Sequence, residues 1–563
     1  MNSTTIFTKQ SLVFDSTHIN VEQVPVPIPR AQFGILNLAA SSVPGSGTTL
    51  ELVFSVDQSG SMSDACSDGR SKMQHIIHTL KNMIVYFREN PDIKVYITID
   101  SFDDVICSIV KRSVITAENV GELIAKVELI VPRGSTNIEL ALNHAGTQVQ
   151  QLRDEFPAHT ICHVFMTDGV ANTGEQSANE LMRLVNRDIT SAFIGFGVEH
   201  DGCLLSSLGS GKNGAYYFID KIENAGLVYG EILHGAVYKF VTNARISVEN
   251  GFIYDFKNNE WVRTLEIEDV VSESDKSYHI ASNNMTGCVV SFTGNRLGDT
   301  ARIHYTITRE DECQDLSKFV YRQRTLQHLF AINSYLKGKD SDNPGAHDLF
   351  TFVTTHAENP DGLDEYVVLR NGLRGFIDEM KLFMTERQLM DDNFMRNLCD
   401  DIYICYRTFG TKYGTMYATS RQASQGNQRC YTVNHTPDEV NQRVPCTGVP
   451  RTGVPRTGVP RTGAPRRGFP PPPKLQRSVP ATFSLDVDID DAWCEEEDDA
   501  LEHSVSGFVD SPYRTPSAAY VMRVLSNGAV PVYDVSEEVS DEEEEKEEGP
   551  QGPPIHCCPH AYM

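Results

Sequence analysis

The chain has 563 residues, 40% of them hydrophobic, and a formal net charge of −27 at pH 7. This length and apolar content can fill more than one hydrophobic core, so a single small domain is excluded. Residues 483–563 hold 21 acidic and 3 basic residues, and such an acidic balance argues against nucleic-acid binding by the whole chain.

The N-terminus, MNSTTIF, has neither a basic start nor an apolar run of signal-peptide length. No window reaches the roughly 18 apolar residues that a membrane-spanning helix needs. We therefore expect an intracellular, cytoplasmic protein that does not span a membrane. Apart from the adjacent pair at 557–558, the 13 cysteines are scattered singly, which favours reduced thiols over a disulfide framework.

Residues 1–48 contain two β-rich runs, at 18–24 and 33–39, separated by prolines that alternate with apolar residues. No helical pattern in this segment can cover the two runs. Because an isolated pair of strands is only marginally stable, we expect both runs to pair with strands of a β-sandwich that follows the next domain.

Residues 49–240 alternate β-rich runs with helical patterns, which is typical of an α/β fold with a doubly wound parallel sheet. The first helical pattern, at 73–87, repeats apolar residues at steps of three and four. This spacing gives the helix one apolar stripe that can pack on the sheet.

Three loops of this domain carry side-chain oxygens: the loop after the apolar strand 52–56, the helix start near 136, and the loop after the apolar strand 161–167. Because the carboxyl ends of parallel strands meet at one edge of a sheet, these oxygens can converge there. Hard oxygen ligands suit Mg²⁺ or Mn²⁺ better than Zn²⁺. Without further information, ordinary turns and helix caps would explain the same residues. The candidate ligands are Asp57, Ser59, Ser61, Thr136 and Asp168.

The order Asp-x-Ser-x-Ser, Thr, Asp resembles the metal-ion-dependent adhesion site of von Willebrand factor A domains, which have a Rossmann-like fold. The resemblance implies that the three hydroxyls contact a divalent cation, Mg²⁺ or else Mn²⁺ or Ca²⁺, directly or through water, while the two aspartates contribute charge. It also implies that one coordination position stays open for a Glu or Asp of a protein partner. The loop at 63–70 is longer and more polar than the family pattern, and we expect it to fold over the metal and narrow the access.

A nucleophilic serine is the enzymatic alternative, since Ser59 and Ser61 lie in a strand-to-helix turn. The Gly-x-Ser-x-Gly arrangement of such nucleophiles is not met at Ser59, because Asp57 occupies the first glycine position. We therefore expect no catalytic residues and no enzyme activity.

Beyond residue 240 the pattern changes twice. Residues 241–312 repeat apolar positions with period two and predict an antiparallel β-sandwich, with one of its strands at 261–271; residues 313–430 return to helical spacing. The end of the helical region, at 413–429, resembles the close of the VWA/Hedgehog intein-like module. This module accompanies A domains in plant RING-finger proteins of the wavy-growth type and in A-domain proteins with a U-box.

The chain departs from those relatives because no cysteine pairs have the spacing of a RING, and the remaining sequence is too low in complexity to fold a U-box. We therefore expect no ligase activity. The first hypothesis is a divalent-cation-dependent protein–protein interaction module or scaffold. The alternative is a substrate-recruiting or regulatory subunit in ubiquitination.

The last third of the chain is compositionally biased. Residues 431–480 repeat Val-Pro-Arg-Thr-Gly and predict an extended linker, because proline and glycine at this spacing oppose both helix and sheet. Residues 481–563 predict an acidic disordered tail. Trp493 lies within a run of acids and is a candidate anchor for a second protein partner, although solvated disorder is the favoured explanation of the acids.

Overall fold

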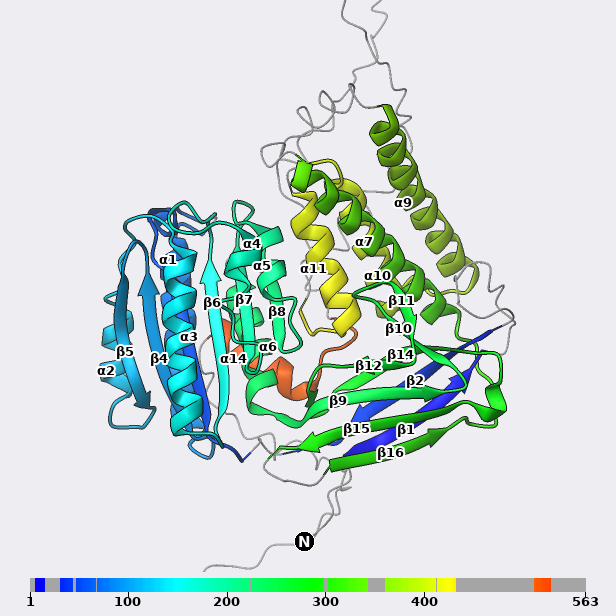
Figure 1. Ribbon diagram of the computed structural model, residues 1–563, viewed down its shortest axis with the longest axis horizontal. Helices are drawn as coiled ribbons and strands as arrows, with labels where there is room; N and C mark the ends of the chain where they lie inside the picture. The colour runs from blue at the N-terminus through cyan, green and yellow to red at the C-terminus, as the bar shows by residue number, and fades with distance from the viewer. Residues whose placement is uncertain are drawn as a thin grey trace, which may run out of the picture.

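The computed structural model describes residues 6–15, 31–43, 47–66, 68–221, 224–297, 302–342, 360–411, 413–431 and 511–527. Figure 1 shows an α/β domain on the left, two antiparallel sheets at the lower right and a group of long helices above them. The predicted strand at 18–24, the basic repeat and Trp493 lie outside the described residues.

The α/β domain contains a six-stranded mixed sheet in the order β5-β4-β3-β6-β7-β8. Neighbouring strands pair in parallel except β4 and β5, which are antiparallel. The predicted α/β fold with a doubly wound sheet is confirmed, and its edge strand β5 departs from the parallel pairing. Three residues separate β4 from β5, too few for the crossover that a parallel pair requires. The strands are β3 (Leu50–Asp57), β4 (Val95–Phe102), β5 (Ile106–Val114), β6 (Thr160–Thr167), β7 (Thr190–Phe196) and β8 (Gly214–Ile219).

Helices cover both faces of this sheet (Figure 1). The strand β3 is buried along its whole length, and its side chains alternate between two cores. Leu52 and Phe54 pack in the core that holds α1 and α6, whereas Val53 packs with Val149 of α3. This is the pattern expected of a central strand covered on both sides. The helices are α1 (Lys72–Glu89), α2 (Val120–Val127), α3 (Ile138–Glu155), α4 (Ala178–Leu181), α5 (Gly202–Leu208) and α6 (Ala225–Val237).

Two antiparallel sheets enclose a second core that includes Leu36, Ile246 and Phe292. The first has the order β1-β2-β14-β10-β11 and the second β12-β9-β15-β16, with β13 beside β9. The strand β1 was not predicted, because the polar, exposed residues 8–10 separate Phe7 from the short buried run at 11–14. The strands are β1 (Phe7–Phe14), β2 (Gln32–Ala40), β9 (Lys239–Glu249), β10 (Phe252–Asp255), β11 (Glu260–Val262), β12 (Thr264–Glu266), β13 (Val270–Val271), β14 (Asp275–Ser282), β15 (Val289–Arg296) and β16 (Arg302–Thr308).

The predicted single strand at 261–271 is three short strands, because the chain crosses from one sheet to the other. In this stretch β11 pairs with β10 of the first sheet, whereas β12 and β13 pair with β9 of the second. The segment before the α/β domain and the segment after it share a sheet, since β2 pairs antiparallel with β14.

Four helices form the upper part of Figure 1 and share a third core. They are α7 (Ser317–Asp342), α9 (Pro360–Glu386), α10 (Asn393–Thr408) and α11 (Gly414–Asn427). Arg421 of α11 is fully buried and is ion-paired with Asp401 of α10.

The last helix described, α14 (Pro516–Asn527), packs against α6 and α1 of the α/β domain. The prediction of disorder over 481–563 was therefore wrong for 511–527. This stretch contains no acidic residue, and the acidic composition of its surroundings concealed it. Its apolar residues recur at helical spacing and enter the core of the α/β domain, with Val521, Met522 and Leu525 buried.

Candidate metal centre

The carboxylate of Asp57 lies at the end of β3 and is fully buried. Its Oδ1 accepts a hydrogen bond from the backbone N–H of Ser59 at 2.7 Å, and its Oδ2 accepts one from the hydroxyl of Thr167 at 2.5 Å. The backbone N–H of Gln58 donates to the carbonyl of Phe102 at 2.9 Å. The turn after β3 is thus held to the ends of both neighbouring strands.

The second loop follows β6 and carries Asp168, which is 1% exposed. The Ser61 hydroxyl donates to Asp168 Oδ1 at 2.8 Å, and the hydroxyl oxygens of Ser59 and Ser61 lie 3.2 Å apart. One chain of hydrogen bonds therefore joins side chains from the loop after β3 to a carboxylate on the loop after β6.

The third loop precedes α3 and carries Thr136, which is 2% exposed. Its backbone N–H donates to the side-chain carbonyl of Asn172 at 2.8 Å, and the Gly60 N–H donates to the carbonyl of Gly134 at 3.2 Å. A Cβ atom placed on Gly169 would lie 3.4 Å from Thr136 Oγ1 and 3.9 Å from Ser61 Oγ. The glycine thus leaves free space between hydroxyls of two different loops.

All five predicted ligands therefore lie together at the carboxyl edge of the sheet, and their role as metal ligands stays a prediction. Burial raises the pKa of Asp57 to about 6, against the hydrogen bonds from Thr167 and Ser59, and the nearby charge of Asp168 raises it further. Two carboxylates at a dry edge need a compensating positive charge. Hydroxyl and carboxylate oxygens are the donor set that hard divalent cations prefer, so these residues fit Mg²⁺.

Lys72, the first residue of α1, was missed by the sequence analysis. Its Nζ lies 2.6 Å from Asp168 Oδ2 and 3.2 Å from Asp64 Oδ2. Burial acts to lower the pKa of Lys72, but the hydrogen bonds and charges of Asp168 and Asp64 outweigh this effect and raise it. One signal was available: a lysine in the first turn of a helix opposes the helix dipole and calls for an anionic neighbour.

The polar loop at 63–70 folds back on the start of α1. The N–H of Cys66 donates to the carbonyl of Arg70 at 2.7 Å, and His75 Nε2 lies 3.1 Å from the carboxylate of Asp68. Asp64 therefore lies next to Lys72, whereas Asp68, further along the loop, is tied to His75 of the helix.

Within the described ranges, no three His, Cys, Asp or Glu side chains gather as a metal site would require. Among the helices that the structure describes, none is long and apolar enough to cross a membrane.

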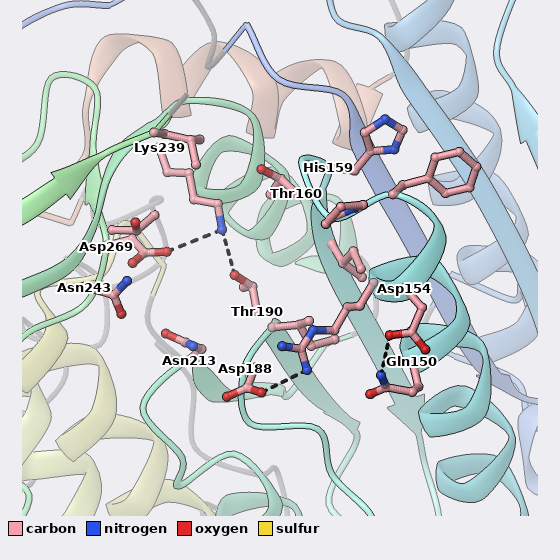
Figure 2. Close-up of a pocket in the computed structure, with 17 residues that line it drawn as sticks. Gln150, Asp154, His159, Thr160, Asp188, Thr190, Asn213, Lys239, Asn243 and Asp269 are labelled. Carbon is pink, nitrogen blue, oxygen red and sulfur yellow. Dashed lines mark hydrogen bonds and ion pairs between the residues drawn. The ribbon is translucent and has the colours of Figure 1, made fainter. Parts of the chain in front are cut away.

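A cavity of about 440 Å³ lies at the opposite end of the sheet, where Thr160 and Thr190 begin β6 and β7. Figure 2 shows Lys239 reaching into it between Thr190 and Asp269, with Nζ–oxygen distances of 2.9 and 3.4 Å. Arg153 and Asp188 form a second ion pair at 2.9 Å. Lys239 and Arg153 are thus each paired with an aspartate of the cavity, and the cavity is separate from the candidate metal centre.

Comparison with known proteins identifies the α/β domain. Residues 51–230 match the family model of the von Willebrand factor type A domain, and this range includes all five candidate ligands. No curated protein matches the chain.

Several solved structures resemble the chain. A von Willebrand factor type A protein from Catenulispora acidiphila is 12% identical, with a TM-score of 0.40, over 60% of this chain and 82% of that one. The ArnB paralog VWA2 from Sulfolobus acidocaldarius is 11% identical, with a TM-score of 0.40, over 76% of this chain and 99% of that one. Proximal thread matrix protein 1 from the mussel byssus, in a structure described as having a zinc-occupied MIDAS motif, is 17% identical, with a TM-score of 0.27, over 34% of this chain and 46% of that one.

Proposed function

Because residues 51–230 form a von Willebrand factor type A domain, we propose that the chain is a non-enzymatic interaction protein that binds a partner through a divalent cation. The proposed ligands are Asp57, Ser59, Ser61, Thr136 and Asp168, and the proposed cation is Mg²⁺, with Mn²⁺ or Ca²⁺ as alternatives. The observation that carries the proposal is the meeting of three loops at one edge of the sheet. Ser61 Oγ donates to Asp168, and the hydroxyls of Ser61 and Thr136 both lie close to the space that a side chain on Gly169 would fill.

The neighbouring residues prepare this edge for a cation. Both oxygens of Asp57 are fixed by hydrogen bonds from Thr167 and Ser59, so the carboxylate is held in one orientation. Burial of both aspartates removes them from water, which strengthens their interaction with any nearby positive charge. A bound cation would supply a positive centre with a position open to a Glu or Asp of a protein partner.

The alternative, a regulatory or substrate-recruiting subunit in ubiquitination, rests only on the resemblance to RING and U-box relatives, and no contact in the described ranges favours it. A second partner at Trp493 likewise stays a prediction.

Titration calorimetry tests the proposal. MgCl₂ is titrated into the full chain after removal of metal with EDTA, for the wild type, Asp57→Ala and Asp168→Ala. Asp92→Ala serves as the control, because Asp92 is exposed in the turn after α1. We expect a binding heat for the wild type and the control only. Equal heats for all four proteins would contradict the proposal, and circular dichroism checks that each variant is folded.

Partner binding is tested by affinity capture from native extract with immobilised full chain. We expect specific partners to be lost with EDTA, to return with Mg²⁺, and to be absent from the Asp168→Ala column. Partners that stay bound in EDTA and on that column would show that another surface does the binding.

A further inference from the structure

The positive charge closest to the candidate metal centre belongs to the chain itself. The ammonium of Lys72 lies 2.6 Å from Asp168 Oδ2, and Ser61 donates to the other oxygen of the same carboxylate. The Lys72 side chain is 18% exposed and that of Asp168 is fully buried. Both oxygens of a proposed metal ligand are therefore occupied, one of them by a cation.

The position of Lys72 is fixed by the start of α1. Ser71 and Gln74 form a reciprocal capping box: the Gln74 N–H donates to Ser71 Oγ at 3.2 Å, and the Ser71 N–H donates to Gln74 Oε1 at 2.7 Å. A cation at this end of a helix is disfavoured by the helix dipole. The carboxylate of Asp168 offsets that cost, because a buried carboxylate without a counter-ion would be costly as well.

A second carboxylate is within reach of the same ammonium. Asp64 Oδ2 lies 3.2 Å from Lys72 Nζ, and the Asp64 side chain is 62% exposed. The two partners of Lys72 therefore differ in their surroundings: one is a buried candidate ligand, and the other is a solvated carboxylate on the loop at 63–70. An ammonium displaced from Asp168 would remain paired with Asp64.

We propose that Lys72 is a built-in counter-ion that holds Asp168 when no divalent cation is bound and passes to Asp64 when one binds. The inference rests on the proposed function, because it concerns the same ligands. It makes divalent binding an exchange of one positive charge for another, so Lys72 weakens the affinity for the cation and stabilises the cation-free protein. Asp64 has the opposite effect on affinity, because it accepts the displaced ammonium.

Four variants of the full chain test this exchange. Lys72→Met removes the charge and keeps most of the apolar stem, Lys72→Arg keeps the charge, and Asp64→Asn removes the second partner. Lys81→Met is the matched control, because Lys81 lies on the same helix and pairs with Glu128, away from the ligands. Lys72→Gln replaces Lys72→Met if the latter does not fold.

Calorimetry with MgCl₂ should show that Lys72→Met binds roughly tenfold more tightly than the wild type, and Asp64→Asn several-fold more weakly. Lys72→Arg keeps the positive charge and should not show the tighter binding of Lys72→Met, whereas Lys81→Met should behave as the wild type does. Thermal unfolding gives a second measurement: in EDTA, Lys72→Met should unfold at a lower temperature than the wild type, and saturating Mg²⁺ should remove that difference.

The outcomes separate this inference from the proposed function. If the wild type and Lys72→Met bind Mg²⁺ equally tightly, the exchange is wrong while the metal site stands. If neither protein binds Mg²⁺, Mn²⁺ or Ca²⁺, the proposed function fails. If only Lys72→Met binds, Lys72 blocks the site instead of exchanging with a cation, and both the exchange and the proposed function of the wild type are wrong.

Discussion

Two regions of the A domain depend on residues that are far apart in the sequence, but the sequence predicts only one of the two contacts. At the candidate metal centre, Ser61 and Asp168 are 107 residues apart. On the face formed by α1 and α6, Asn82 contacts Leu525 of α14, which is 443 residues away. Only the first region was predicted, so distance along the chain alone does not explain the difference.

On the α1–α6 face, two glycines of α6 let the backbone of α14 come close because they carry no side chain. A Cβ on Gly226 would lie 2.6 Å from the Cα of Ser526, and one on Gly230 would lie 2.4 Å from the Cα of Met522. The two glycines are one helical turn apart, so α14 approaches the backbone of α6 along two successive contacts. Figure 1 shows α14 beside α6 behind the sheet. At the candidate metal centre the contacts are made by side chains that the sequence shows. On this face the contact depends on glycines, where there is no side chain to see in the sequence.

The largest expected effect comes from filling the space between α6 and α14. Gly230→Val places a branched side chain where Met522 lies, so α14 should leave the face and expose its buried apolar residues. We expect the free energy of unfolding to fall by on the order of 5 kcal/mol. Urea unfolding measures the loss, and hydrogen exchange over 516–527 shows whether α14 is released.

Gly235→Ala is the matched control, because a Cβ at Gly235 of the same helix meets no atom within 4 Å. It should be neutral or stabilise by up to about 1 kcal/mol, since alanine favours helix over glycine. Equal losses in both variants would contradict the close approach of α14. In either variant Mg²⁺ affinity should change little, because both glycines lie outside the metal centre.

The second effect is a pH dependence on the same helix. Glu231 of α6 accepts hydrogen bonds from the N–H groups of Cys430 and Tyr431, and burial raises its pKa to about 7. The folded protein therefore binds a proton more tightly than the unfolded chain does. The contribution of Glu231 to stability is greatest below about pH 4.5, the ordinary pKa, and is lost as the pH rises to about 7.

Glu231→Gln should remove this slope, so the difference in the free energy of unfolding between wild type and variant should change by on the order of 2 kcal/mol between pH 5 and pH 8. Urea titrations across this range measure it. Gln151→Ala, at an exposed position of α3 that carries no ionisable group, should give a difference that does not vary with pH. A flat difference for Glu231→Gln as well would show that the carboxylate is ionised throughout.

The third effect concerns the metal centre alone. Thr136→Val removes one hydroxyl and keeps the shape of the side chain, so Mg²⁺ affinity should fall roughly tenfold, or about 1.4 kcal/mol. The stability of the cation-free protein should change little. Thr173→Val is the control, because Thr173 is an exposed threonine on the neighbouring loop. Calorimetry distinguishes the two, and unchanged binding in Thr136→Val would remove Thr136 from the ligand set.

The α/β fold could be predicted because each of its elements carries a local signal. The strand β3 ends in an acid and β6 is followed directly by one, and parallel pairing of the two strands brings both acids to one edge of the sheet. The placement of Lys72 could not be predicted in the same way, because it depends on where α1 begins after an irregular loop. The antiparallel strand β5 departs from the pattern because three residues cannot make a crossover.

The docking of α14 had a weaker signal. All but two residues of α6 are buried, and a helix that is apolar on every side must be covered by another element. That feature indicates a missing partner without identifying it. The partner is a stretch of 12 residues in an acidic region. Its helical spacing identifies it as the partner only once the two glycines of α6, spaced Gly-x-x-x-Gly, are known to form a contact surface.

The smallest effect is expected at the far end of α14. Asn82 of α1 donates from Nδ2 to the carbonyl of Leu525 at 2.9 Å, so it satisfies a carbonyl in the last turn of α14 that has no partner within the helix. Asn82→Ala should cost about 1 kcal/mol in the free energy of unfolding, after correction for the helix propensity of alanine. Asn143→Ala, at an exposed position of α3, provides that correction in urea unfolding. If Asn82→Ala still lowers the free energy of unfolding in the Gly230→Val background, Asn82 acts within α1 alone. If it no longer does so, its contribution depends on the docked helix α14.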